Sequence, residues 1–183
     1  LTAEKTIELT RAAAKIELTV NVTNLTINNE TWEANTAGMK VSFFNGVKKG
    51  LIDDGSDNGA TVDHNGDYFK VEDRTFSSVE SSTTQFKQSV PFYSYTTRWE
   101  ANAEDEVYLK LSIPWRVKTP DAEAYQTYYY LIPVNMDGKS LVRNSFYKIT
   151  LDVKALGGQS EPIEVKPSYV VLDWSTGEVN VDL

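Results

Sequence analysis

The chain has 183 residues, a formal net charge of −8 and no cysteine. That length fits one large domain or two small ones, and it suffices to bury a core without disulfides. An acidic chain repels phosphate backbones, so we expect no nucleic-acid partner, and zero cysteine excludes thiolate nucleophiles and cysteine-based metal sites. No apolar run approaches the roughly 18–20 residues of a membrane-spanning helix, which predicts that the chain has no transmembrane helix.

The front of the chain predicts two strands. Ile7 and Leu9 alternate with polar residues, and we interpret residues 1–10 as a leading edge strand or as the end of a preceding domain. A second alternation covers residues 15–27, and its apolar phase slips by one position before Leu25. Such a slip indicates a β-bulge or a short turn. The main domain is then expected over residues 11–183.

The next part of the chain alternates between strands and polar segments. Residues 28–38 are polar and predict a loop anchored by Trp32, whereas residues 39–44 predict a compact strand. Residues 45–65 are rich in Gly, Asp and Asn, which predicts a long excursion over the surface. Short strands are expected to follow at residues 68–71 and 91–95.

The second half has the cleanest pattern. Every second residue is apolar from Val107 to Val117, which predicts a half-buried strand. Pro114 lies within it and lacks an N–H, so we expect an edge strand or a bulge. Four more strands, one of them ended by a turn at Gly157-Gly158, are expected at residues 126–134, 141–156, 163–174 and 178–183. Consecutive strands without helices predict an all-β fold, an antiparallel β-sandwich with long polar loops.

His64 is the sole histidine, so a Ser-His-Asp triad would have to include it. It lies in a glycine turn within the loop-like stretch, where a solvated histidine is the simpler interpretation. The 26 acidic residues allow many carboxylate pairs, but no local motif marks a glycosidase pair. We therefore predict that the chain has no catalytic residues and is not an enzyme.

The same turn has the beginning of a calcium-loop pattern. Asp63, Asn65 and Asp67 supply the one-three-five oxygen spacing, but Tyr68 replaces the expected glycine and Arg74 the expected bidentate acid. A hairpin turn is the alternative, and we prefer it. The sequence thus predicts no metal and no cofactor.

Aromatic residues leave a carbohydrate-binding interpretation open. Trp99 and the tyrosines at 128–130 could line a sugar platform. Consecutive strand residues point to opposite faces, however, so at most two of the three tyrosines share a surface. Packing in the core and at a sheet edge is the preferred interpretation.

Five short segments resemble, in order, those of a known family. Arg11–Val20 resembles the Arg-x-x-Ala-Lys-Ile/Val-x-Val strand of Bacteroidales fimbrillins, the subunits of type V pili, and Phe92–Tyr95 resembles their Phe-Tyr-x-Tyr/Phe strand. Segments similar to the C-terminal signature of the family follow at Tyr129–Pro133, Arg143–Ile149 and Val170–Trp174. The ordered combination is what makes the resemblance specific.

The resemblance implies a transthyretin-like β-sandwich, matching the C-terminal domain of a fimbrillin. It implies a structural subunit (stalk, tip or accessory) of a bacterial surface fimbria, exposed outside the outer membrane, which supports cell adhesion and has other fimbrial subunits as partners. Family members are exported as lipoproteins, trimmed by an arginine-specific protease and assembled by strand exchange. We therefore expect a mature or trimmed form, with the lipidated cysteine and most of an N-terminal domain upstream.

Partner contacts are expected at the ends of the chain. A strand that buries little in its own domain is poorly held unless another chain pairs with it. The alternating residues predicted to make these contacts are Ile7, Leu9, Val179, Val181 and Leu183. Both strands could instead complete the domain's own sheet. As an alternative function, the chain would be a carbohydrate- or host-binding module of a cell-surface protein, with contacts through residues 28–38 and 45–66.

Overall fold

The structure, a computed structural model, describes residues 12–48, 68–79, 82–99, 104–119, 124–135 and 138–174. These ranges form fourteen strands and one three-residue 3-10 turn, η1 (Thr36–Gly38). The predicted all-β character is therefore confirmed. None of the helical structure in the described ranges is long and apolar enough to cross a membrane.

The strands follow the alternation of the sequence. In β9, buried and half-buried residues alternate from Tyr108 to Trp115, as the apolar pattern predicts. The first seven strands are β1 (Ala13–Asn21), β2 (Leu25–Ile27), β3 (Glu30–Ala34), β4 (Lys40–Val47), β5 (Tyr68–Ser78), β6 (Gln85–Gln88) and β7 (Phe92–Tyr95). The others are β8 (Thr97–Arg98), β9 (Tyr108–Val117), β10 (Gln126–Pro133), β11 (Ser140–Leu141), β12 (Ser145–Asp152), β13 (Ile163–Glu164) and β14 (Ser168–Asp173).

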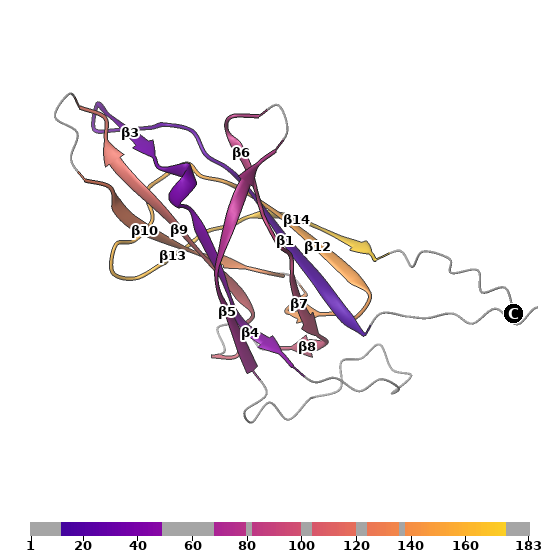
Figure 1. The fold of residues 1–183 in the computed structure, drawn as a ribbon. Helices are drawn as coiled ribbons and strands as arrows, with labels where there is room; N and C mark the ends of the chain where they lie inside the picture. The colour runs from indigo at the N-terminus through magenta and orange to yellow at the C-terminus, as the bar shows by residue number, and fades with distance from the viewer. Residues whose placement is uncertain are drawn as a thin grey trace, which may run out of the picture.

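One sheet runs through the molecule and folds over on itself. Its strands lie in the order β13-β10-β9-β4-β5-β6-β1-β12-β14. β5 and β6 connect the side formed by β9 and β10 with the side formed by β1, β12 and β14 (Figure 1). β2, β3 and β7 pair alongside this path, while β8 and β11 form a separate two-stranded sheet. The path ends in β13 and β14.

The sheet is mixed, so the prediction of an antiparallel sandwich is wrong in this respect. β1 runs parallel to β12, from Lys15↔Phe146 to Asn21↔Asp152, and β10 runs parallel to β13. The alternation of apolar residues is the same in parallel and antiparallel strands, so it does not reveal the direction of pairing. Direction depends on how the chain returns to the sheet.

Residues 28–38 are not simply a loop, because they contain β3. A tight turn at Asn28 and Asn29, both with positive φ (52° and 65°), joins β2 to β3. Asparagine tolerates this left-handed backbone better than most residues. β3 also pairs with β9. Its polar composition hid it, since Trp32 is its one large apolar residue and packs against the core.

β9 is an inner strand that keeps a continuous register with β10 across Pro114, so the prediction of an edge strand or a bulge there is wrong. β9 pairs with β10 on one side; on the other it pairs with β4 up to Ser112 and with β3 from Trp115 onward. Pro114 lies between these two partners, where its missing N–H interrupts no ladder. Its carbonyl accepts a hydrogen bond from the Asn35 N–H (2.9 Å).

The core lies between the two layers of the folded sheet. Trp99, Tyr128 and Tyr130 are all at most 8% exposed. This confirms that they pack inside rather than form a sugar platform, with Tyr129 directed outward. Gly157 and Gly158 approach the backbone of β10. Gly158 exchanges two hydrogen bonds with Tyr129 (2.8 and 3.0 Å).

A pair of leucines tests this placement of core and surface. Leu111 on β9 is fully buried, whereas Leu172 on β14 is 41% exposed. Leu111→Ala should lower the free energy of unfolding by about 2–5 kcal/mol, because it removes buried surface and leaves a cavity. Leu172→Ala should change it by about 0.5 kcal/mol or less. Urea unfolding followed by circular dichroism measures both, and equal losses would contradict the surface position of β14.

Candidate assembly interface

The two ends of the folded sheet leave one flank of the molecule open. β14 pairs with β12, and within the described ranges no strand pairs with its other side. β13 has two residues and pairs with β10, and residues 165–167 connect it to β14. We call the flank between β13 and β14, with the adjoining residues 151–156, the open seam.

Large apolar side chains are exposed along the open seam. In the part of the chain that the structure describes, six large hydrophobic residues are strongly exposed, and four of them lie on β13 or β14. Apolar exposure concentrated on the terminal strands of a sheet is unusual, because such edges are normally short or shielded. The four residues are Ile163 (50%), Val170 (56%), Val171 (45%) and Leu172 (41%).

Val171 shows most clearly that the seam is unfinished. Its cross-strand neighbour on β12 is Tyr147, which is 1% exposed. Residues directly opposite each other point to the same face of the sheet, so Val171 points to the core side. It nevertheless remains 45% exposed, because the other layer does not extend over it.

The backbone of β14 is directed partly away from its partner. The Trp174 N–H donates to the Asn144 carbonyl (2.6 Å), continuing the ladder with β12. Since backbone direction alternates along an antiparallel strand, the N–H groups of Val170 and Leu172 face β12. Those of Val171 and Asp173 face the opposite side. An edge of this kind can receive another strand.

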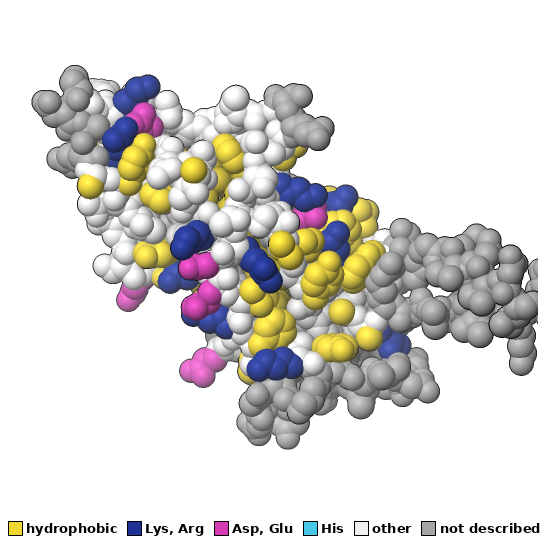
Figure 2. Space-filling model, viewed as in Figure 1, with side chains coloured by type: hydrophobic (Ala, Val, Ile, Leu, Met, Phe, Trp, Pro, Cys, Tyr) yellow, Lys and Arg dark blue, Asp and Glu magenta, His cyan; other side chains and the backbone are white. Residues whose placement is uncertain are grey.

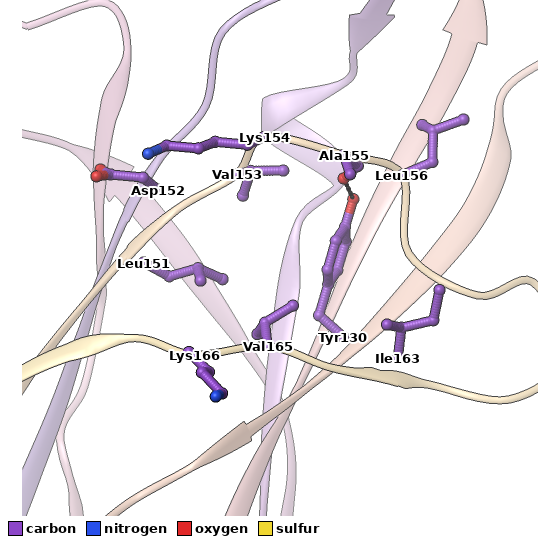
Figure 3. Close-up of a pocket in the computed structure, with 10 residues that line it drawn as sticks. All are labelled: Tyr130, Leu151, Asp152, Val153, Lys154, Ala155, Leu156, Ile163, Val165 and Lys166. Atoms are coloured by element: carbon purple, nitrogen blue, oxygen red, sulfur yellow. Dashed lines mark hydrogen bonds between the residues drawn. The ribbon is translucent and has the colours of Figure 1, made fainter. Parts of the chain in front are cut away.

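A cavity of ≈ 170 Å³ lies at the seam. Its size is similar to that of an engineered apolar cavity of about 150 Å³ that binds benzene. Figure 3 shows Tyr130 standing between the segment that follows β12 and the segment that contains β13. The cavity therefore has room for one large apolar side chain. Its apolar lining comes from Tyr130, Leu151, Val153, Ala155, Leu156, Ile163 and Val165.

Tyr130 holds the wall of this cavity in place. Its hydroxyl donates to the Ala155 carbonyl (3.0 Å) and accepts from Trp115 Nε1 (3.1 Å). Burial raises the pKa of Tyr130 to about 12, since the charged phenolate is poorly solvated there. The side chain is thus a neutral, fully engaged hydrogen-bonding group.

The predicted partner residues Ile7, Leu9, Val179, Val181 and Leu183 lie outside the described residues. The structure therefore does not test them. Sequence reasoning missed the open seam, because Val170, Val171 and Leu172 form a continuous apolar run. Such a run is also typical of a strand buried on both faces.

The predicted turn with His64, Asp63, Asn65 and Asp67 also lies outside the described residues. Tyr68, at the sixth position of that pattern, donates its hydroxyl to Asp105 Oδ2 (3.3 Å). Over the described ranges, no group of three or more His, Asp or Glu residues could hold a metal ion.

No family model matches the chain. The chain is 27% identical over 173 residues to the major fimbrium tip subunit FimD of Porphyromonas gingivalis, and a second sequence of that protein matches equally. The match covers 93% of this chain but 23% of FimD, so the chain spans about a quarter of the length of the curated relatives that it matches. The resemblance to Bacteroidales fimbrial subunits is confirmed. This similarity points to a structural, non-enzymatic protein.

Two solved structures also align with the chain. A candidate cell adhesion protein from Parabacteroides distasonis is 14% identical, with a TM-score of 0.47, and the alignment covers 93% of this chain and 54% of that one. Another, from Bacteroides eggerthii, is 13% identical, with a TM-score of 0.48, covering 90% of this chain and 56% of that one.

Removing the Tyr130 hydroxyl tests the buried wall of the cavity. Tyr130→Phe should lower the free energy of unfolding by about 1–3 kcal/mol, because Trp115 Nε1 loses its acceptor. The raised pKa means that folding favours the protonated phenol, so this contribution is complete below pH 10 and lost as the pH rises toward about 12. Stability of the unmodified chain should therefore fall more steeply than that of the variant over this range. Urea unfolding at several pH values measures both, and parallel pH profiles would contradict the assignment.

Proposed function

We propose that this chain is a structural subunit of a bacterial surface fimbria. The similarity to a fimbrium tip subunit across 93% of the chain supports this function, and the name of that relative favours a tip role over a stalk or accessory role. The subunit would lie outside the cell, on a fimbrium at the outer-membrane surface, where it supports adhesion. Its partners would be other fimbrial subunits, and its folded sheet would be a transthyretin-like sandwich.

Assembly by strand exchange would use the open seam as the acceptor. A partner strand beside β14 would satisfy the outward backbone groups and cover Val171 from the core side. The cavity beside Tyr130 would take one apolar side chain of that strand. Burying such a side chain contributes about 1.5–3 kcal/mol. The open seam is thus the single feature on which the assembly proposal depends.

Two adjacent valines give a matched test of the acceptor. Val170 and Val171 are both exposed and lie on opposite faces of β14. Val171→Asp should abolish incorporation into fimbriae, because a carboxylate would then be buried without a partner when the seam closes. Val170→Asp should leave incorporation nearly unchanged. Electron microscopy of fimbriae and quantification of incorporated subunit measure the effect.

Both valine variants should melt within a few degrees of the unmodified chain, since each side chain is largely in water. Loss of assembly in both variants, or in neither, would show that β14 is not the acceptor.

The trailing residues are the proposed donor. Val179→Asp combined with Val181→Asp should block assembly, because alternate apolar anchors no longer enter a neighbouring subunit. Asn180→Asp is the matched control and should assemble normally. Thermal melting of the monomer separates the alternatives: an unchanged melting temperature assigns the strand to a partner, while an unfolded monomer assigns it to the domain's own core.

A further inference from the structure

The outer face of the layer that contains β7, β1, β12 and β14 carries a row of large side chains. Cross-strand pairing places Tyr93 opposite Lys15, Lys15 opposite Phe146, and Phe146 opposite Leu172. Lys148 lies two residues after Phe146 on β12, on the same face of the sheet. Figure 2 shows hydrophobic and basic side chains gathered over these strands. We call Tyr93, Trp174, Phe146, Lys15 and Lys148 the aromatic–lysine face.

Two rings of this face stack on each other. Tyr93 and Trp174 come from distant parts of the chain and stack with 5.7 Å between ring centroids and 23° between planes. Tyr93 remains 46% exposed. The exposed Tyr93 ring thus offers an apolar face at the surface, with Trp174 stacked behind it.

Lysines supply positive charge beside the rings. The ammonium groups of Lys15 and Lys148 lie 4.1 and 4.9 Å from the centre of the Phe146 ring. The carboxylate of Glu17 is bound to Lys87 (2.8 Å) and lies 3.8 Å from Lys15. Among the described residues, Lys148 forms no salt bridge. The face thus has excess positive charge on a chain whose net charge is −8.

The opposite layer shows that an outward aromatic ring need not be exposed. There the rings of Phe44, Tyr129 and Tyr125 each lie under a cation, and none of these rings is strongly exposed. Tyr93 differs, because nearly half of its surface remains open to solvent. The covered groups are the Phe44–Tyr108 stack under Lys70 (4.6 Å), Tyr129 under Lys110 (4.4 Å) and Tyr125 under Arg116 (4.4 Å).

We propose that the aromatic–lysine face binds a glycan that carries a carboxylate or sulfate group. The C–H face of a sugar ring would stack on the exposed Tyr93 ring, which Trp174 supports from behind, and the anionic group would be held by the Lys148 ammonium. A polypeptide strand would add at the β14 edge rather than on this outer face, because β1 and β12 beneath the face are paired on both sides.

This inference goes beyond the assembly role and uses different side chains. Val171 and the cavity lie on the core side of the layer, whereas the aromatic–lysine face lies on its outer side. Glycan binding can be measured on the isolated chain and incorporation into fimbriae on whole cells. Failure of one proposal is therefore distinguishable from failure of the other.

Titration of the isolated chain with defined saccharides, followed by calorimetry and by tryptophan fluorescence, tests the proposal. We expect saturable binding of sialyllactose, of a heparin-derived oligosaccharide, or of both, and binding of neutral lactose at least about tenfold weaker, a difference of about 1.4 kcal/mol. Sialyllactose alone would identify a carboxylate ligand, heparin alone a sulfate ligand, and both a general anionic requirement. Each of these results supports the proposal.

Three variants separate stacking, charge and general effects. Tyr93→Ala should weaken binding about tenfold or more, and Lys148→Gln should reduce the preference for the anionic sugar to within about threefold. Tyr129→Ala, on the opposite layer, should bind as the unmodified chain does. The proposal is overturned if no saccharide binds saturably, if Tyr129→Ala loses as much affinity as Tyr93→Ala, or if an acidic peptide displaces the saccharide and binds more tightly.

Discussion

A β-sheet that folds back on itself without closing must end in two edges, and this constraint governs the molecule. The ladder from β13 to β14 runs strand to strand through the molecule and encloses the core between its two layers. At its ends, no described strand covers the outward backbone groups of β14 or the inward Val171. Proteins usually shorten or shield such edges. β13 fits that rule with two residues, but β14 is a six-residue apolar strand.

The layer that contains β12 and β14 has two faces, and each face suits a different kind of ligand. The core side offers an incomplete strand position and a cavity, which suit an extended segment with alternate apolar anchors. The outer side offers stacked rings and lysines on a sheet whose backbone is already paired, which suit a ligand recognised through side chains. Because the two surfaces lie on opposite faces of one layer, a strand bound at the seam and a ligand bound on the outer side would not compete.

The sequence predicts the elements better than their arrangement. Alternation from Val107 to Val117 identified β9, and the run of strands identified the all-β class. Parallel pairing of β1 with β12 was not predictable, because side-chain alternation carries no direction. β3 was hidden by its polar composition. The seam was missed since Val170 to Leu172 has the composition of a buried strand, and the aromatic–lysine face joins residues such as Tyr93 and Trp174 that only the fold brings together.

The central claim is that a partner strand closes the seam beside β14. Hydrogen exchange at the Val171 amide, measured in the monomer and in assembled fimbriae, tests it most directly. Its N–H points away from β12, so it should exchange fast in the monomer and become protected by at least about a hundredfold on assembly, while the Leu172 amide is protected in both. A Val171 amide that stays unprotected in fimbriae, or that is equally protected in the monomer, would contradict the account.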